Sequence, residues 1–158
     1  MAEPLADQIM RQIEHAAELY YRLVLVIAPA DAGKTTALQD VHDRIGAPLV
    51  NVNLELSRRM LELTERQRAL QLARLLSEVV NAAQADVILL DNIEVLFDVA
   101  LKQDPLRLLQ GLSRNKTVVA TWNGSVDNEH LVYATPGHPE YKPYPKRDFL
   151  AVTPEATA

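Results

Sequence analysis

The residues whose types and spacing suggest chemistry begin where an apolar run, residues 24–27, ends. After it come the small residues 28–32, and then Gly33-Lys34-Thr35 opens an amphipathic segment. A strand, a loop and a helix in this order are the context of a phosphate-binding P-loop, whose backbone N–H groups converge on an anion. The lysine reaches the β- and γ-phosphates, and the threonine hydroxyl ligates Mg²⁺. The predicted nucleotide-binding residues are Pro29, Ala30, Asp31, Ala32, Gly33, Lys34, Thr35 and Thr36.

This P-loop departs from the usual pattern at two positions. Ala28 stands where the first glycine belongs, and Asp31 occupies a loop position that glycine often holds. Aspartate tolerates a positive φ, so the backbone can still fold around a phosphate, but its carboxylate weakens anion binding unless it points away. The alternative interpretation is a chance Gly-Lys-Thr after a buried strand.

A second apolar run, residues 87–90, ends in Asp91. In P-loop proteins a strand of this kind lies beside the first strand, and its aspartate orients the water shell of Mg²⁺. We therefore predict Thr35 and Asp91 as the metal-binding residues, with ATP or ADP and Mg²⁺ as the ligands. The alternative makes Asp91 a cap at the end of its strand.

The residues that follow Asp91 are candidates for catalysis. Many hydrolysing P-loop proteins place a glutamate directly after the aspartate to activate water, but Asn92 holds that position here. Asparagine can position a water molecule but cannot accept its proton. This leaves Glu94 as the predicted base if the turn after the strand brings it back, and Glu55 as a rival.

A further apolar run, residues 118–122, ends at the same predicted edge of the sheet and is followed by Asn123 and Gly124. In AAA+-like ATPases a threonine or asparagine at this edge contacts the γ-phosphate or the attacking water. We predict this role for Asn123. The pair Asn123-Gly124 is also typical of a tight turn, so that alternative stays open. Trp122 is predicted to lie in the core or in an interface.

The composition of the whole chain limits the classes of function. Its 158 residues suit one domain, and 48% hydrophobic but only 5% aromatic residues predict an aliphatic core. The net charge of −5 argues against a protein that coats nucleic acid, and without cysteine there are no disulfides or thiolate metal sites. The histidines show no metal-ligand spacing. With no apolar run near the length of a membrane span and no signal-peptide pattern, we expect no membrane association and a cytoplasmic location.

Hydrophobic periodicity predicts strands that alternate with helices, and hence an α/β fold with a mainly parallel sheet flanked by helices. Thr64 and Gln67 form a capping-box pattern, Asp104-Pro105 is a typical helix start, and the proline-rich residues 135–146 should be extended. We predict a single domain with an N-terminal helix (1–22), a core (23–134) and an extended arm and tail (135–158). The expected helices are 4–21, 34–45, 65–83 and 105–112, and the expected strands are 23–27, 49–53, 86–91, 117–122, 131–133 and 149–152.

Several arginines gather among glutamates in the middle of the chain. Such a run is usually a solvated helix face with i,i+4 ion pairs. The alternative is a surface for a polyanion or for the nucleotide of a neighbouring subunit. Arg114 and Lys116 are further candidates for such a contact between subunits. The clustered residues are Arg58, Arg59, Arg66, Arg68 and Arg74.

Five stretches, together with the P-loop, resemble a single family. They are residues 51–59, 89–94, 101–110, 121–124 and 133–141. Over nearly its full length the chain is similar to the BrxF family, the small P-loop proteins of type 3 BREX bacteriophage-exclusion systems. The P-loop is shared by many proteins, so the middle and C-terminal stretches are the more specific part. The resemblance implies a role in antiviral defence beside a larger ATPase, a methyltransferase and a phosphatase-like component.

The chain lacks parts of a full AAA+ module. Between Asn123 and Leu131 there is no room for the helix that normally carries the arginine finger, and no helical lid follows. We therefore expect a P-loop NTPase-type, AAA+-like domain without a lid. It would bind Mg-ATP as a homo-oligomer and hydrolyse it slowly, or on stimulation by a partner such as the large BREX ATPase. The alternatives are a non-enzymatic assembly module and a DNA-contacting accessory module, each with a degenerate nucleotide site. DNA is otherwise expected as an indirect partner.

The C-terminal arm is expected to take part in self-association. Tyr133, Tyr141 and Tyr144 lie in or beside it, and tyrosine is enriched at interface hot spots. Proline also lowers the entropy that an extended arm loses when it docks. The alternative is that the arm folds back and covers the edge of its own sheet.

Overall fold

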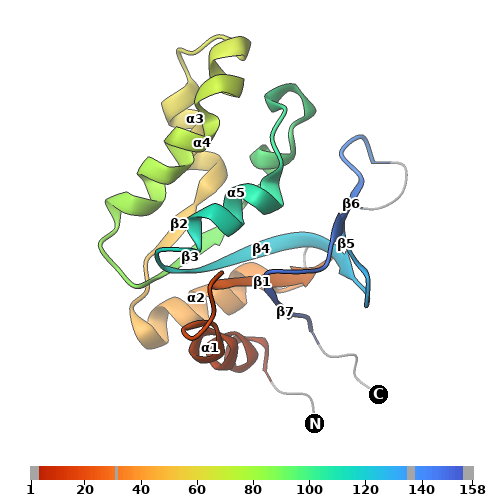
Figure 1. Cartoon of the computed structure of the whole chain (residues 1–158). Helices are drawn as coiled ribbons and strands as arrows, with labels where there is room; N and C mark the ends of the chain where they lie inside the picture. The colour runs from red at the N-terminus through yellow and green to blue at the C-terminus, as the bar shows by residue number, and fades with distance from the viewer. Residues whose placement is uncertain (1–3, 31, 135–137, 155–158) are drawn as a thin grey trace.

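The computed structural model describes residues 4–30, 32–134 and 138–154 and shows an α/β fold built on one sheet (Figure 1). Its central path runs β2-β3-β4-β1-β7, and each neighbouring pair on this path is parallel. The predicted α/β fold with a mainly parallel sheet flanked by helices is therefore confirmed. The strands of this path are β1 Leu23–Ala28, β2 Leu49–Asn51, β3 Val87–Asp91, β4 Thr117–Val126 and β7 Leu150–Val152.

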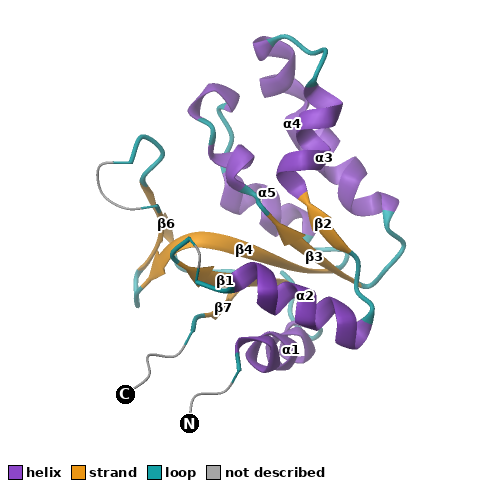
Figure 2. Ribbon diagram, turned by 180° about the vertical axis from the view of Figure 1, so that it is seen from behind, coloured by secondary structure: helices purple, strands orange, loops and turns teal. Residues whose placement is uncertain are grey.

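Helices cover both faces of the sheet (Figure 2). The helices α1 and α2 pack on one face, and α3, α4 and α5 pack on the other. Successive residues of β1 point to opposite faces, so Leu25 joins the core under α3 to α5 while Val26 joins the core under α1 and α2. Burial on both faces explains why β1 is apolar throughout. The helices are α1 Leu5–Ala16, α2 Lys34–Ile45, α3 Val52–Met60, α4 Glu65–Ala82 and α5 Pro105–Leu112, with the 3₁₀ helices η1 Glu94–Phe97 and η2 Val99–Leu101.

Two of the predicted helix starts are confirmed by their hydrogen bonds. The Thr64 hydroxyl accepts from the Gln67 N–H while the Gln67 side chain accepts from the Thr64 N–H, which is the reciprocal capping box. The Asp104 carboxylate accepts from the Arg107 N–H at the start of α5, directly before Pro105. Both caps act over three residues, which is why the sequence alone could indicate them.

The predicted ends of the first helix and of the second strand are wrong. The first helix ends at Ala16, and residues 17–21, which were predicted helical, form turns and bends. The second strand stops at Asn51, because the Asn51 side chain accepts a hydrogen bond from the Leu54 N–H and starts α3. Glu55 therefore lies on a helix and not at the end of a strand.

The fourth strand continues through Asn123 and Gly124, so a tight turn at this pair is wrong. The second half of β4 pairs antiparallel with β5 His130–Tyr133, which pairs with β6 Lys142–Pro145. These strands, β4 from Asn123 on with β5 and β6, are called the hairpin below. Gly124 permits the close approach of β5, because a Cβ atom there would lie 1.9 Å from the carbonyl oxygen of Val132.

The C-terminal arm packs on its own sheet over the residues that the structure describes. Residues 135–137 and 155–158 of the predicted arm lie outside the described residues. Strand β7 runs parallel to β1 at the edge of the sheet, where a final strand was predicted, and β6 pairs with β5. This is the folded-back alternative. Tyr133 and Tyr144 are buried, so they cannot form the interface hot spots expected of them, and Tyr141 remains exposed.

Four aromatic side chains form one cluster where η1 meets the hairpin. The rings of Phe97 and Tyr133 stack with centroids 3.5 Å apart, and Trp122 packs edge-on against Phe97 at 4.9 Å. Tyr144 closes the cluster against Trp122 at 5.4 Å. Trp122 was predicted to lie in the core or in an interface, and it is fully buried in the core. Its indole N–H donates to the Val132 carbonyl. The core is thus aliphatic between the helices and aromatic beneath the hairpin.

Candidate functional site

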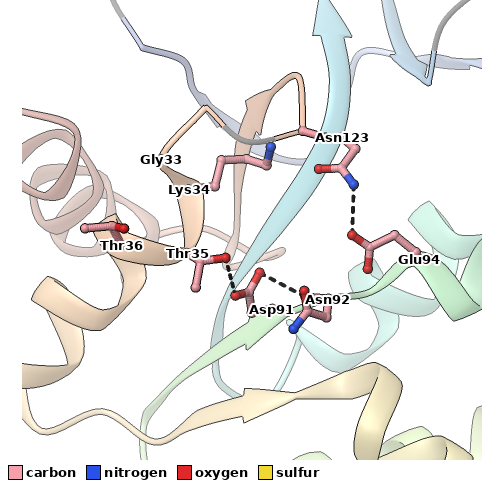
Figure 3. A pocket seen from close by; sticks show the side chains of 9 residues that line it. Gly33, Lys34, Thr35, Thr36, Asp91, Asn92, Glu94 and Asn123 are labelled. Carbon is pink, nitrogen blue, oxygen red and sulfur yellow. Dashed lines mark hydrogen bonds between the residues drawn. The ribbon is translucent and has the colours of Figure 1, made fainter.

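Polar side chains meet where β1, β3 and β4 reach their carboxyl ends (Figure 3). In parallel sheets these ends lie along one edge, where the loops that follow can form a binding crevice. Here they line a cavity of about 400 Å³. The lining residues are Ala30, Gly33, Lys34, Thr35, Thr36, Asp91, Asn92, Glu94 and Asn123, all of which the sequence had singled out for nucleotide, metal or catalysis.

The start of α2 forms one wall of this cavity. Gly33 has a φ of 86°, a conformation that glycine adopts without steric cost, and it has no side chain that could cap the helix. A helix N-terminus carries a partial positive charge on its amide groups. Lys34 is 6% exposed, and its Nζ donates to the carbonyl oxygens of Ala28 at 2.9 Å and Pro29 at 2.6 Å. The wall therefore combines an ammonium group with the positive end of a helix.

Asp91 is the centre of a hydrogen-bond network. Its Oδ2 accepts from Thr35 Oγ1 at 2.7 Å, and its Oδ1 accepts from Thr121 Oγ1 at 2.8 Å and from the Asn92 N–H at 2.9 Å. Asp91 is 6% exposed, and these donors offset the cost of removing its charge from water. The two predicted metal ligands, Thr35 and Asp91, contact each other directly. Asp91 thus does more than cap its strand.

The strand that carries Asp91 was predicted to lie beside β1, and this prediction is wrong. Strand β4 lies between β1 and β3. Thr121 of β4 spans the gap, because its hydroxyl reaches the Asp91 carboxylate from the neighbouring strand. Sequence reasoning had given Thr121 no such role. A signal was available, since Thr121 is a hydroxyl residue near the end of an otherwise apolar strand.

A sharp turn after β3 brings Glu94 back to the cavity. Asn92 has a φ of 53°, in the left-handed region that asparagine tolerates, and its carbonyl accepts from the Asn53 N–H at 2.9 Å. Helix η1 then begins at Glu94, whose Oε1 accepts from Asn123 Nδ2 at 2.8 Å. The two predicted catalytic side chains therefore form a hydrogen-bonded pair. Figure 3 shows Glu94 and Asn123 on the opposite side of the cavity from Thr36.

A second cavity of about 460 Å³ adjoins the first and shares Ala30, Glu94 and Asn123 with it. Its walls include Pro29 and, from the hairpin, Gly124 and Tyr133. Burial, together with the nearby charges of Glu94 and Glu140, raises the pKa of Tyr133 above its usual value. Its phenol therefore stays protonated and neutral beside Glu94. This cavity could not be predicted from the sequence, because segments that are distant in the chain build it.

Other predicted residues lie apart from the first cavity. Ala32 is exposed and does not line it, and Asp31 lies outside the described residues. Glu55, the rival base, forms ion pairs on α3 with Arg58 at 3.7 Å and Arg59 at 2.7 Å. These pairs, with that of Arg74 and Glu78 at 3.8 Å, fit the solvated helix face.

Lys116, predicted as a contact between subunits, is a structural residue. It is buried, and its Nζ donates to the carbonyl oxygens of Val80 at 3.2 Å and Ala83 at 2.9 Å. These carbonyls belong to the last turn of α4 and the residue after it, where a cation is favourable. Lys116 is therefore committed to the end of α4 and cannot reach another subunit.

The oxygen atoms of Thr35 and Asp91 at the first cavity are suitable ligands for Mg²⁺. Among the described residues, no three His, Asp or Glu side chains are close enough together to hold an ion by themselves. Magnesium does not need such a group, because it is usually bound by one or two protein oxygens together with phosphate oxygens and water. Thr35 and Asp91 supply one hydroxyl and one carboxylate oxygen at the same place. The residues present therefore suit Mg²⁺ that arrives with a phosphate ligand.

Comparisons with known proteins do not assign the chain to a family. No protein-family model matches it, and no curated protein is significantly similar to it. Among the described residues, no helix is long and apolar enough to cross a lipid bilayer. The geometry of the cavity and the pattern of the sequence are therefore the basis for any functional conclusion.

Proposed function

We propose that this chain binds Mg-ATP or Mg-ADP in the cavity formed by α2, β3 and β4. The observation that carries the proposal is the 2.7 Å contact between Thr35 and Asp91, which belong to segments far apart in the sequence. A hydroxyl and a carboxylate that meet beside a buried lysine and a helix N-terminus suit a phosphate group with its Mg²⁺. Bound Mg-ATP supplies an activated phosphoryl group, and the chain supplies the side chains that hold it.

The finer fold that we propose is a P-loop NTPase-type, AAA+-like domain without a helical lid. Gly33, Lys34 and Thr35 lie at the passage from β1 to α2, which is where a P-loop requires them. Asp91 ends β3 and Asn123 lies on β4 at the same edge of the sheet. This arrangement supports the fold, and the strands β5 and β6 of the hairpin are an addition to it.

We propose weak ATPase activity that self-assembly or a partner stimulates. Glu94 can accept a proton from water, and Asn123 holds its carboxylate at the wall of the cavity. Asn92 occupies the position of the usual base and cannot accept a proton, which favours slow turnover. The same observation favours a second candidate function, in which the chain is a non-enzymatic assembly module and any bound nucleotide is structural.

We also propose that the chain belongs to the BrxF family and serves in a type 3 BREX defence system in the cytoplasm. The support is the sequence resemblance. Three of the resembling stretches, the P-loop, residues 89–94 and residues 121–124, contribute side chains to one cavity. The proposed partners are further copies of the chain and other BREX components such as the large ATPase.

Calorimetric titration with Mg-ATP tests the binding proposal. Lys34→Ala removes the ammonium group and Thr35→Ala removes the hydroxyl, so each should weaken affinity by about tenfold or more, as for charge-assisted hydrogen bonds. Lys146→Ala and Thr153→Ala are matched controls at exposed positions and should stay within about twofold of the parent chain. Unchanged affinity in both cavity variants, with both folded, would overturn the proposal.

Phage infection assays test the role in defence. In cells that carry a type 3 BREX system, replacement of the resident BrxF by this chain should preserve the reduction in plaque number, whereas replacement by Lys34→Ala should not. If the parent chain is expressed and binds Mg-ATP but does not protect the cells, the BREX assignment is rejected. The nucleotide-binding proposal is unaffected by that result.

A further inference from the structure

A second polar hollow, the arginine groove, lies along α5 and shares no residue with the two cavities of the nucleotide site. It has a volume of about 440 Å³ and is bounded by α5, by Tyr21 before β1 and by residues 144–148, which lead from β6 toward β7. Its cationic side chains are Arg107, Arg114 and Arg147. Because α5 covers the face of the sheet opposite α1 and α2, the groove opens on that side of the molecule (Figure 1).

These three arginines line one hollow and make no ion pair with a carboxylate, although Arg22, Arg66 and Arg68 also lack such a pair among the described residues. Arg44, Arg58, Arg59 and Arg74 each pair with a carboxylate on the surface. Among the described residues, Arg107, Arg114 and Arg147 have no carboxylate partner within ion-pair distance. In a chain with a net charge of −5, three guanidinium groups in one hollow without acidic partners form a local site for an anion.

The groove has features beyond its positive charge. Arg107 lies on α5 and Arg114 lies in the turn that follows the helix, and both line the groove. Tyr20, which is 64% exposed, lies against the Arg114 guanidinium at 5.1 Å. Gln110 fixes the far wall, because its Nε2 donates to the carbonyl of Arg147 at 3.1 Å.

Two carboxylates also line the groove and set its selectivity. Asp104 is engaged at the start of α5, where it accepts from the Arg107 N–H, and Asp148 lies next to Arg147. With three guanidinium groups and two carboxylates, the groove remains cationic overall. It suits an extended anion whose charges are spaced apart, since a compact anion at either carboxylate would be repelled.

We propose that the arginine groove binds the phosphodiester backbone of a single nucleic-acid strand. Guanidinium groups contact phosphates with two parallel hydrogen bonds, and an exposed aromatic ring such as Tyr20 beside Arg114 can stack a base. A duplex is read by a helix or ribbon that protrudes into its major groove, whereas this surface is concave. The ligand binds without a sequence preference, because the groove offers charge and one exposed ring beside it rather than a pattern of base contacts.

Fluorescence anisotropy with a labelled oligonucleotide of about 12 nucleotides tests the proposal at low salt. The triple variant Arg107→Gln/Arg114→Gln/Arg147→Gln should lose about tenfold or more in affinity and reduce the salt dependence of log K by about 2. The matched control Arg58→Gln/Arg66→Gln/Arg74→Gln removes the same charge from α3 and α4 and should stay within about twofold. Equal losses in both triples, or no binding by the parent chain, would overturn the proposal.

A single substitution in the groove provides an independent test that removes no arginine. Gly111 lines the groove, and a Cβ atom added there would meet no atom within 4 Å. Gly111→Glu places a carboxylate in the groove and should weaken oligonucleotide binding about tenfold, whereas the neutral Gly111→Gln should not. Thermal melting of both variants confirms that they are folded. If Glu and Gln have the same effect, the charge of the groove does not govern binding.

Competition identifies the chemistry that the groove recognises. A single-stranded oligonucleotide without label should displace the probe, while poly-glutamate at equal charge should not. Displacement by poly-glutamate as effective as by the oligonucleotide would replace the proposal with an acidic protein segment as the ligand. The variant Lys34→Ala should bind the oligonucleotide as the parent chain does, because the groove shares no residue with the nucleotide cavity.

Discussion

The two carboxylates of the nucleotide site, Asp91 and Glu94, are held in different ways. Asp91 ends a central strand and accepts hydrogen bonds from two hydroxyl groups and a backbone N–H, all from the parallel sheet, the turn after it or the start of α2. Glu94 begins a short 3₁₀ helix and accepts a bond from Asn123 at the base of the hairpin. The last residue of that helix, Phe97, stacks in the aromatic cluster.

This difference suggests that binding and catalysis depend on separate parts of the fold. The groups proposed to hold Mg²⁺ and phosphate belong to α2 and to the sheet, which is buried between two layers of helices. The proposed base depends on η1, on Asn123, which is the last β4 residue paired with β1, and on the contacts of Phe97 with Trp122 and Tyr133. Substitutions can therefore affect one part and spare the other.

The largest effect is expected from Glu94→Gln. Glutamine keeps an oxygen that can accept the bond from Asn123, but it cannot accept a proton from water. ATP turnover by the assembled protein should fall by about 10²- to 10⁴-fold, while the affinity for Mg-ATP stays within about twofold. Steady-state kinetics and calorimetry measure the two quantities, with Glu55→Gln as the control. No loss of turnover, or the same loss in Glu55→Gln, would show that Glu94 is not the base.

Phe97→Ala should lower the free energy of unfolding, because Phe97 is the ring through which η1 packs against Trp122 and Tyr133. Removal of a buried aromatic ring typically costs about 3–5 kcal/mol in the free energy of unfolding. Val99→Ala, at a 67% exposed position two residues away, should change it by less than about 0.5 kcal/mol. Urea titrations measure both. The affinity of folded Phe97→Ala for Mg-ATP should remain close to that of the parent chain, and a loss as large as that of Thr35→Ala would contradict the separation of the two parts.

Asp91→Asn should act on binding. The amide keeps one acceptor oxygen but loses the negative charge that suits Mg²⁺, so Mg-ATP affinity should fall by about 10- to 100-fold. Asp86→Asn, an exposed aspartate before the same strand, is the matched control. Titration without Mg²⁺ should reveal a smaller difference between Asp91→Asn and the parent chain. An equal difference with and without the ion would mean that Asp91 acts on the fold alone.

The smallest effect concerns pH. Burial, with smaller contributions from Asp104 and Glu140, raises the pKa of Tyr144 to about 12, while in the unfolded chain it is about 10. Between these values the folded state keeps a proton that the unfolded state releases, so stability is complete below pH 10 and decreases as the pH rises above it. Tyr144→Phe should reduce this decrease. Urea midpoints at neutral pH and near pH 10.5 measure it, and identical slopes for both proteins would exclude Tyr144 as a cause.

The parts of the fold that the sequence could predict depend on neighbours in the chain. The capping box at Thr64 and the start of α5 at Asp104 act over three residues. The apolar runs of β1 and β3 directly reflect burial on both faces. The cavity could be predicted from the sequence to the same extent, because parallel strands bring their carboxyl ends to one edge, and the residues that follow them therefore meet.

What the sequence could not predict depends on contacts between distant segments. Asn123-Gly124 favours a turn locally, but pairing with β5 and the bond from Trp122 to Val132 extend the strand through it. The pairing of β5 with β4 and β6 accompanies the burial of Tyr133 and Tyr144, which were expected in an interface between subunits because tyrosine is enriched at hot spots. The position of β4 between β1 and β3, and with it the role of Thr121, follows from the order of strands in the sheet, which local patterns do not encode.

The order β2-β3-β4-β1-β7 has a consequence for synthesis on the ribosome. Strand β1 is the first strand to be made, yet its neighbours in the sheet are β4 and the final strand, β7. Until β4 emerges, both edges of β1 lack their partners, and this strand is wholly apolar. Such a nascent chain exposes an aggregation-prone apolar segment for most of translation. A chaperone that binds short apolar segments should therefore associate with the growing chain from β1 onward and leave it late, when β7 completes the edge.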